Sequence, residues 1–221
     1  MTSPSPPARR GALIRLLGIA AALTALGAGA GWWSTRRPPI AFTHSQCKGM
    51  VMGQSKVLVT YASRAGSTGE IGEAIMKRLC TDGFDADLRE VSRVESLDSY
   101  AAIVLGSAVR YGGWLPEMLK FVQRHRDTLA RRPLAYFSAC SKAKDQSAAS
   151  LAEMASYAKA AREIAAPATE AFFAGKIDMA KLSFFDRMMV RMIGSAEGDF
   201  RDWAAIGAWA RTLVPLFQSR D

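Results

Sequence analysis

Short apolar runs alternate with amphipathic stretches from Lys56 to the end of the chain. The apolar runs predict strands at 56–62, 84–91, 101–108, 132–140 and 169–175. The amphipathic stretches predict helices at 67–80, 117–130, 148–165, 181–193 and 203–217. Because a helix between two parallel strands must cross back over the sheet, the pattern predicts an α/β fold with a doubly wound, five-stranded parallel sheet.

Small and polar residues follow three of the predicted strands. They form the segments SRAGST (63–68), GSAVRYGGW (106–114) and SACSK (138–142). Sheets of this kind bind ligands beyond the carboxyl ends of their strands. We therefore expect the three segments to meet at one edge of the sheet and to form a binding site there.

Two interpretations fit the first segment. Ser67 or Thr68 would cap the following helix by accepting a hydrogen bond from one of its first amides. Alternatively, these amides would surround a phosphate, with Gly66 letting the backbone approach it closely. Taken alone, the segment favours the helix cap. The other two segments are needed to choose between the helix cap and the phosphate loop.

The second segment contains two aromatic residues, Tyr111 and Trp114, on either side of Gly112 and Gly113. Each ring is a candidate flat partner for a bound aromatic ligand, and each would otherwise be ordinary surface packing. A phosphate loop beside flat side chains is what a flavin mononucleotide requires.

The formal net charge of +9 is concentrated near the N-terminus. Residues 1–55 contain six basic residues and no acidic one, so residues 56–221 contain 23 basic and 20 acidic residues, a balance of +3. This balance is ordinary for a globular domain and indicates no nucleic-acid partner. Membrane topology or an anionic lipid surface explains the N-terminal excess better.

The N-terminal region contains an uncharged apolar stretch within Gly11 to Trp33, preceded by Arg9 and Arg10. One interpretation is a permanent hydrophobic helix that anchors the chain in the inner (cytoplasmic) membrane. The other is a cleaved export signal of the twin-arginine type, with a cleavage site at 28–30. A buried core helix is disfavoured. The predicted organisation is an anchor or signal at 1–33, a linker at 34–55 and a domain at 56–221.

Cysteine and histidine residues indicate neither a metal site nor a hydrolytic triad. Cys47, Cys80 and Cys140 are far apart and have no metal-ligand spacing. We expect Cys80 to pack as a small hydrophobic residue at the end of its helix. His44 lies in the N-terminal region and His125 in a charged helix end, so no catalytic side chain is nominated.

The motifs YASRAGSTGEI (61–71) and GSAVRYG (106–112), together with FFDRMMVRMI (184–193) and the helix start RDW, resemble the flavodoxin-like family. Within it they resemble the menaquinone-dependent, oxygen-independent protoporphyrinogen oxidases. The resemblance covers about Lys56 to Phe217. It implies a flavodoxin-like sheet with strand order 2-1-3-4-5 and an FMN cofactor.

The resemblance also implies which residues would bind FMN. The phosphate would be held by Ser63, Arg64, Ala65, Gly66, Ser67 and Thr68. The ring would be bordered by Ser107, Ala108, Val109, Arg110, Tyr111 and Gly112, and closed on its other side by Ser138, Ala139, Cys140 and Ser141. Ala65 departs from the family pattern, in which this position commonly carries a hydroxyl or an acid.

The implied activity is oxidation of protoporphyrinogen, a small organic substrate, with electrons passed to a quinone in haem biosynthesis at the membrane. Arg110 is a candidate contact for a substrate carboxylate or a partner in an ion pair. Two alternatives stay open: an FMN-binding electron carrier without its own substrate, and a flavodoxin-shaped protein that has lost FMN.

The predicted helix at 181–193 carries a stripe of large apolar side chains: Phe185, Met188, Met189 and Met192. We expect this stripe to belong to the core. The alternative is a face that meets the bilayer or a quinone tail, with arginines at the lipid head groups.

Overall fold

The computed structural model describes residues 41–49, 56–145, 147–192 and 196–218. These fall into two compact units: residues from 179 to 196 belong to one, and residues 41–178 and 197–218 belong to the other. The predicted N-terminal anchor or signal lies outside the described residues. Among the helices that are described, none is long and apolar enough to cross a membrane.

The larger unit is built on a sheet whose five parallel strands lie in the order β3-β2-β4-β6-β7. Their bounds are β2 Val57–Ala62, β3 Ala86–Glu90, β4 Ala102–Arg110, β6 Leu134–Ala139 and β7 Thr169–Phe173. Two short strands that the apolar pattern did not predict pair antiparallel at the sheet, β1 (Ser45–Cys47) with β3 and β5 (Gly113–Trp114) with β4. The sheet therefore has seven strands rather than the predicted five.

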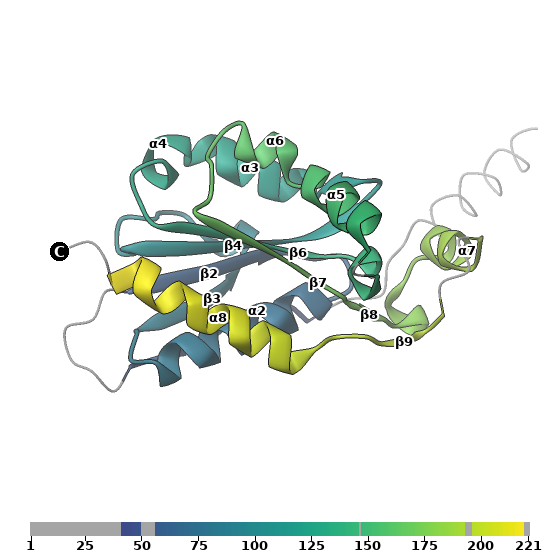
Figure 1. The fold of residues 1–221 in the computed structure, drawn as a ribbon, viewed down its shortest axis with the longest axis horizontal. Coiled ribbons are helices and arrows are strands. Elements are labelled where there is room, and N and C mark those ends of the chain that lie inside the picture. Colours follow the sequence, from purple (N-terminus) through teal and green to yellow (C-terminus); the bar gives the residue numbers. More distant parts are fainter. Residues whose placement is uncertain (1–40, 50–55, 146, 193–195, 219–221) are drawn as a thin grey trace, which may run out of the picture. The chain divides into compact units, whose positions relative to one another are not determined.

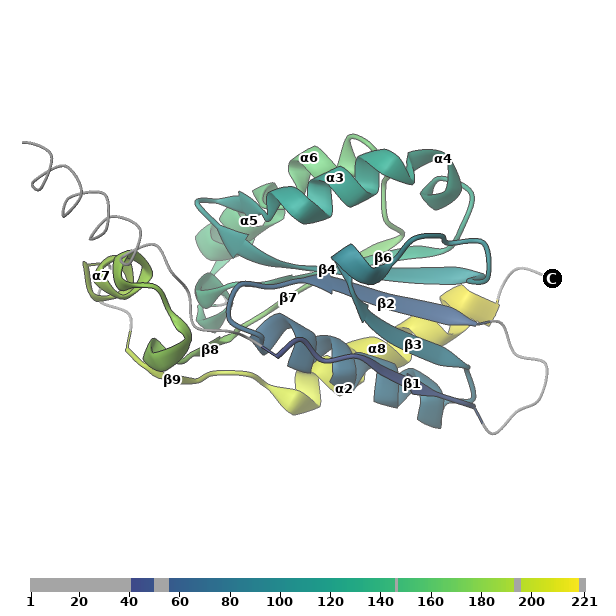
Figure 2. The same cartoon turned by 180° about the vertical axis from the view of Figure 1, so that it is seen from behind.

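Alternating side chains of each central strand enter two separate cores. In β2, Val57 and Val59 pack in the core under α2 (Ser67–Thr81) and α8 (Trp203–Gln218). Leu58 packs in the core on the opposite face. That face is covered by α3 (Pro116–Arg124), α4 (Arg126–Leu129), α5 (Ala148–Ser156) and α6 (Lys159–Arg162). Figures 1 and 2 show helices on both faces, which explains why β2 is buried along its whole length.

Two of the predicted helices are each broken into two shorter ones. The backbone leaves helical geometry at His125, between α3 and α4, and near Ala158, between α5 and α6. The break at His125 lets Leu129 of α4 reach the same core as Phe121 of α3. Burial of both side chains therefore outweighs continuation of one straight helix.

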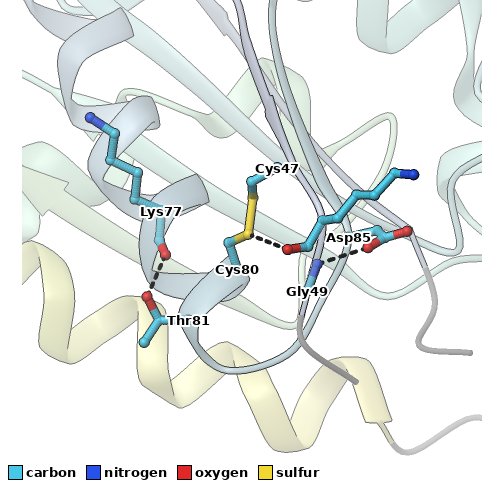
Figure 3. Close-up of a disulfide and its surroundings, with 7 residues drawn as sticks. Cys47, Gly49, Lys77, Cys80, Thr81 and Asp85 are labelled. Atoms are coloured by element: carbon cyan, nitrogen blue, oxygen red, sulfur yellow. Dashed lines mark hydrogen bonds between the residues drawn. A yellow bond between two sulfur atoms is a disulfide. The ribbon is translucent and has the colours of Figure 1, made fainter. Parts of the chain in front are cut away.

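The segment predicted as a linker contributes to the sheet, because β1 lies within it. A disulfide joins Cys47 of β1 to Cys80 in the last turn of α2 (Figure 3). The expectation that Cys80 is a free, packed thiol is therefore wrong. Pairing with a residue 33 positions away leaves no local sequence signal.

A short ladder and several single turns complete the larger unit. Strands β8 (Lys176–Ile177) and β9 (Gly198–Asp199) pair antiparallel. Single 3₁₀ turns follow β3 and β6, as η1 (Val91–Arg93) and η2 (Ser141–Lys144).

The smaller unit contains η3 (Met179–Lys181) and α7 (Phe184–Met192). On α7, Phe185, Met188 and Met192 are exposed, Met192 to 68%. The prediction that these three side chains belong to the core is wrong, and the side chain of Met189, the fourth member of the stripe, lies outside the described ones.

Candidate functional site

The carboxyl ends of β2, β4 and β6 lie level with one another. Ala62 of β2 pairs with Ser107 of β4, and Ser107 pairs with Ser138 of β6. The three segments predicted to form a site therefore leave the sheet at the same edge, as expected for a doubly wound fold.

The first segment turns into α2 through Gly66, whose φ of 90° lies in the left-handed region that favours glycine. The Ser63 hydroxyl accepts a hydrogen bond from the Gly66 amide at 2.9 Å. Among the residues that the structure describes, no side chain caps α2. The helix-cap interpretation of Ser67 and Thr68 is therefore wrong. The Gly69 and Glu70 amides donate to the Gly66 carbonyl, which leaves the amides of Ser67 and Thr68 for an external acceptor.

Thr68 supplies an independent sign of a ligand at this helix end. Its side chain is fully buried, and its Oγ1 has no hydrogen-bond partner within the described part of the chain. An unpaired buried hydroxyl costs roughly 1–3 kcal/mol. A phosphate oxygen that accepts hydrogen bonds from this hydroxyl and from the amides of Ser67 and Thr68 would remove that cost, so the residues present fit an FMN phosphate.

Arg64 and Ala65 contribute less to an anion site than the sequence suggested. The Arg64 guanidinium is 2.8 Å from the Glu117 carboxylate at the start of α3. The charge of Arg64 is thus paired with α3, the helix that follows the second segment (106–114). Ala65 is half-buried and offers only its backbone.

Ser107 and Ser138 hold the base of the site through hydrogen bonds within the protein. The Ser107 hydroxyl accepts from the Leu115 amide at 3.0 Å and donates to the Ala108 carbonyl at 2.9 Å. Trp114 Nε1 donates to the Ser138 hydroxyl at 2.8 Å. Since Trp114 is only 4% exposed and packs against Tyr136, the prediction that it is a flat partner for a ligand is not supported.

Tyr111, unlike Trp114, is exposed to solvent, at the tip of the second segment. Its side chain is 81% exposed and its φ is 52°, and Gly112 follows with φ 74°. A non-glycine residue in this region costs on the order of 1 kcal/mol and persists where the surroundings or a function require it. The Arg110 guanidinium lies 5.1 Å from the Tyr111 ring centre. Ala108 and Val109 are half-buried and lead the backbone into this loop.

The third segment is tied to the neighbouring strand. The Cys140 amide donates to the Phe173 carbonyl at 3.0 Å, and Ala139 and Cys140 are buried while Ser141 is exposed at the start of η2. Burial raises the pKa of the Cys140 thiol to about 11. This cysteine is therefore protonated at neutral pH and is not a nucleophile.

A cavity of about 530 Å³ lies at η2 and the end of β7. It is lined by Ala143, Lys144, Phe172, Phe173, Ala174, Phe200, Asp202 and Ala205. The Lys144 ammonium sits 3.0 Å above the centre of the Phe200 ring, and burial lowers the pKa of Lys144. Sequence reasoning missed this cavity because its walls come from three distant segments. The pair Phe172–Phe173 at a strand end was the one available signal.

A second cavity, of about 400 Å³, lies on β1 and β3, and none of its lining residues belongs to the three loops. There His44 Nδ1 accepts from the Glu90 amide at 3.4 Å, and burial lowers the pKa of His44. His44 thus belongs to the structured domain, not to a leader.

The chain was compared with known families and proteins. The flavodoxin domain model matches residues 58–203. A protoporphyrinogen IX dehydrogenase (quinone) of Escherichia coli K12 is 26% identical over 174 residues, covering 73% of this chain and 96% of the relative. A protein of the same name from Leishmania major is 24% identical over 180 residues, covering 76% and 78%. The solved structure of flavodoxin 1 from Bacillus cereus aligns with a TM-score of 0.47 at 15% identity, covering 73% of this chain and 98% of that one.

Proposed function

The chain belongs to the flavodoxin domain family, and from that premise we propose that it is an FMN-dependent oxidoreductase that takes electrons from a reduced organic substrate and passes them to a quinone. The observation that carries the proposal is the uncapped start of α2 beside the buried, unpartnered hydroxyl of Thr68. Both features fit a phosphate group at the position where this family holds its cofactor.

Residues of the three loops would hold FMN. The amides of Ser67 and Thr68 and the Thr68 hydroxyl would bind its phosphate, and the left-handed Gly66 lets the backbone turn around it. Tyr111 offers an exposed flat surface for the ring. When bound, FMN supplies reversible transfer of electrons, and the protein supplies position and electrostatics.

The substrate would occupy the cavity that contains Lys144. A volume of about 530 Å³ is in the range of pockets for small organic ligands. Its aromatic walls suit a flat apolar ring, and the ammonium of Lys144 suits a carboxylate. A protoporphyrinogen carries both features, and the names of the Escherichia coli and Leishmania relatives support this substrate and a quinone acceptor.

The chain's own residues would position substrate rather than transfer protons. Cys140 remains protonated, and Arg64 is engaged with Glu117. Ser107 and Ser138 are engaged in hydrogen bonds that hold the loops. Their role is to keep the three loops in register so that substrate meets the cofactor ring in one orientation.

The test is steady-state oxidation of protoporphyrinogen with a soluble quinone by wild type and Lys144→Met. We expect KM for this substrate to rise about tenfold, the effect of losing a charge-assisted contact, while FMN content stays unchanged. Lys142→Met is the matched control, because Lys142 is paired with Glu153 at 2.9 Å and does not line the cavity. Equal KM values for wild type and Lys144→Met would contradict this substrate site.

A second candidate function is an FMN electron carrier that has no substrate of its own. The high exposure of Tyr111 favours it, since a carrier presents its flavin edge to a partner protein. The same assay separates the two: a carrier contains FMN but does not oxidise porphyrinogen with a quinone.

A further inference from the structure

The segment from Thr43 to Gly49 is attached to the domain at several points. The Tyr61 hydroxyl donates to the Thr43 carbonyl at 2.9 Å, and the Gly49 amide donates to the Asp85 carboxylate at 2.8 Å. A Cβ at Gly49 would lie 1.9 Å from the Gly83 carbonyl oxygen, so the two backbones pack with no room for a side chain. This segment is therefore packed into the domain and belongs to its structure.

A disulfide adds a covalent link to this attachment. The Cα atoms of Cys47 and Cys80 are 6.2 Å apart, within the range of bonded pairs. Figure 3 shows the bond between the strand and the helix. The Lys48 carbonyl oxygen lies 3.3 Å from the Cys80 sulfur. The third cysteine, Cys140, is buried in the loop after β6, so it does not compete for either partner.

The disulfide reaches outside the part of the chain that matches the family. The match begins at residue 58, whereas Cys47 lies in β1, ahead of it, and Cys80 lies within it. The bond thus joins an added strand to a helix of the shared fold. Further upstream, the sequence carries the apolar stretch within Gly11 to Trp33 behind two arginines.

We propose that the Cys47–Cys80 disulfide is formed outside the cytoplasm and that the flavodoxin-like domain works on that side of the membrane. Disulfides persist in oxidising compartments, whereas cytoplasmic thiols are kept reduced. An apolar N-terminal stretch gives the chain a means of reaching that side, whether as an anchor or as a signal. The proposal does not depend on the cofactor or the substrate.

Formation of the bond requires an oxidant, for which we name a protein disulfide of a thiol-oxidising protein. The thiolate of one cysteine attacks that disulfide and forms a mixed disulfide, and the second cysteine then displaces the reduced protein. The Cys47 and Cys80 thiols together lose two electrons and two protons. The oxidant takes up both and leaves as a dithiol.

The first experiment counts free thiols in the full-length chain. Cells are quenched in acid, and the denatured protein is treated with maleimide-polyethylene glycol before or after reduction. We expect one adduct without reduction, at Cys140, and three after it. Cys47→Ser should give two adducts in both samples, because Cys80 then lacks its partner. Three adducts in the unreduced wild type would overturn the proposal.

The second experiment tests the compartment. In a host that lacks its extracytoplasmic thiol oxidase, the unreduced wild type should shift from one adduct toward three. Alkaline phosphatase, which is active only outside the cytoplasm, is fused after Asp221 and should be active. An inactive fusion, or a single adduct that persists without the oxidase, would contradict the assigned compartment. Neither readout involves FMN, so failure here leaves the proposed activity untouched.

Discussion

At the scale of single residues, the buried hydroxyl of Thr68 separates a ligand site from a plain helix start. Replacing it with the isosteric valine should weaken FMN binding by roughly 10- to 150-fold, because one hydrogen bond to a charged phosphate is worth roughly 1.5–3 kcal/mol. The FMN-free protein should be as stable as wild type or more stable, since its unpartnered oxygen is removed. Fluorescence titration with FMN and urea unfolding measure the two effects.

Thr60→Val is the matched control for Thr68→Val. The Thr60 hydroxyl is also buried and has no hydrogen-bond partner among the described residues, but it lies within β2 rather than at the loop. Its removal should affect stability in the same direction and leave the dissociation constant of FMN unchanged. If both variants bind FMN as wild type does, the phosphate is not at Thr68.

The buried thiol of Cys140 makes a prediction about pH. Burial raises its pKa from 9.0 to about 11, so the folded protein retains a proton that the unfolded chain releases. The contribution of this thiol to the free energy of unfolding should therefore be fully present below pH 9 and be lost as the pH rises from 9 to 11. Urea unfolding at pH 8 and pH 10.5 should show a larger loss for wild type than for Cys140→Ala. Equal losses would mean that the thiol is not shielded.

At the scale of elements, the disulfide determines whether β1 stays on the sheet. Replacing both Cys47 and Cys80 with serine should lower the free energy of unfolding by about 3–4 kcal/mol, the value for a loop of this length. The sequence separation is 33 residues. Chemical denaturation measures the change. Reductant should bring wild type to the level of the double variant and leave that variant unaffected; a reductant effect on the double variant would point to another cause.

Long buried elements were predictable from the sequence, whereas short added ones were not. The apolar run in β2 identifies a strand buried on both faces, and the segments after β2, β4 and β6 identify the edge that carries the site. The strand Ser45–Cys47 has no apolar pattern, because its place comes from pairing with β3 and from the bond to Cys80.

Within the site, the residue types were predictable but their roles were not. Trp114 and Tyr111 look alike in the sequence. The hydrogen bond from Trp114 to Ser138 buries one ring, while the left-handed backbone at Tyr111 exposes the other. Whether an aromatic ring of this segment is buried or exposed depends on contacts with distant segments.

At the scale of the whole molecule, the two proposals together constrain the substrate. A quinone dissolved in the bilayer can be reached from either side, but a porphyrinogen would have to be present outside the cytoplasm to enter the Lys144 cavity. Substrates other than porphyrinogens are therefore worth assaying with the same quinone.

The N-terminal stretch leads to a prediction for the intact protein. If it is a permanent anchor, the full-length chain should sediment with membranes, resist extraction by alkaline carbonate and dissolve in detergent. Intact mass of the purified protein should include residues 1–33. A mass that begins after Ala30 would show a cleaved export signal instead.

If the N-terminal stretch is an anchor, the attachment of β1 also limits how far the domain can move from the membrane. If residues 34–55 were all free, they would form a leash of up to roughly 80 Å at about 3.6 Å per residue. Because the chain is attached to the domain from Thr43 onward, only residues 34–42 are left to span the distance, and their reach is at most roughly 30 Å. A tethered domain would thus be confined close to the lipid surface, where a hydrophobic electron acceptor is concentrated, without any further binding energy for the membrane.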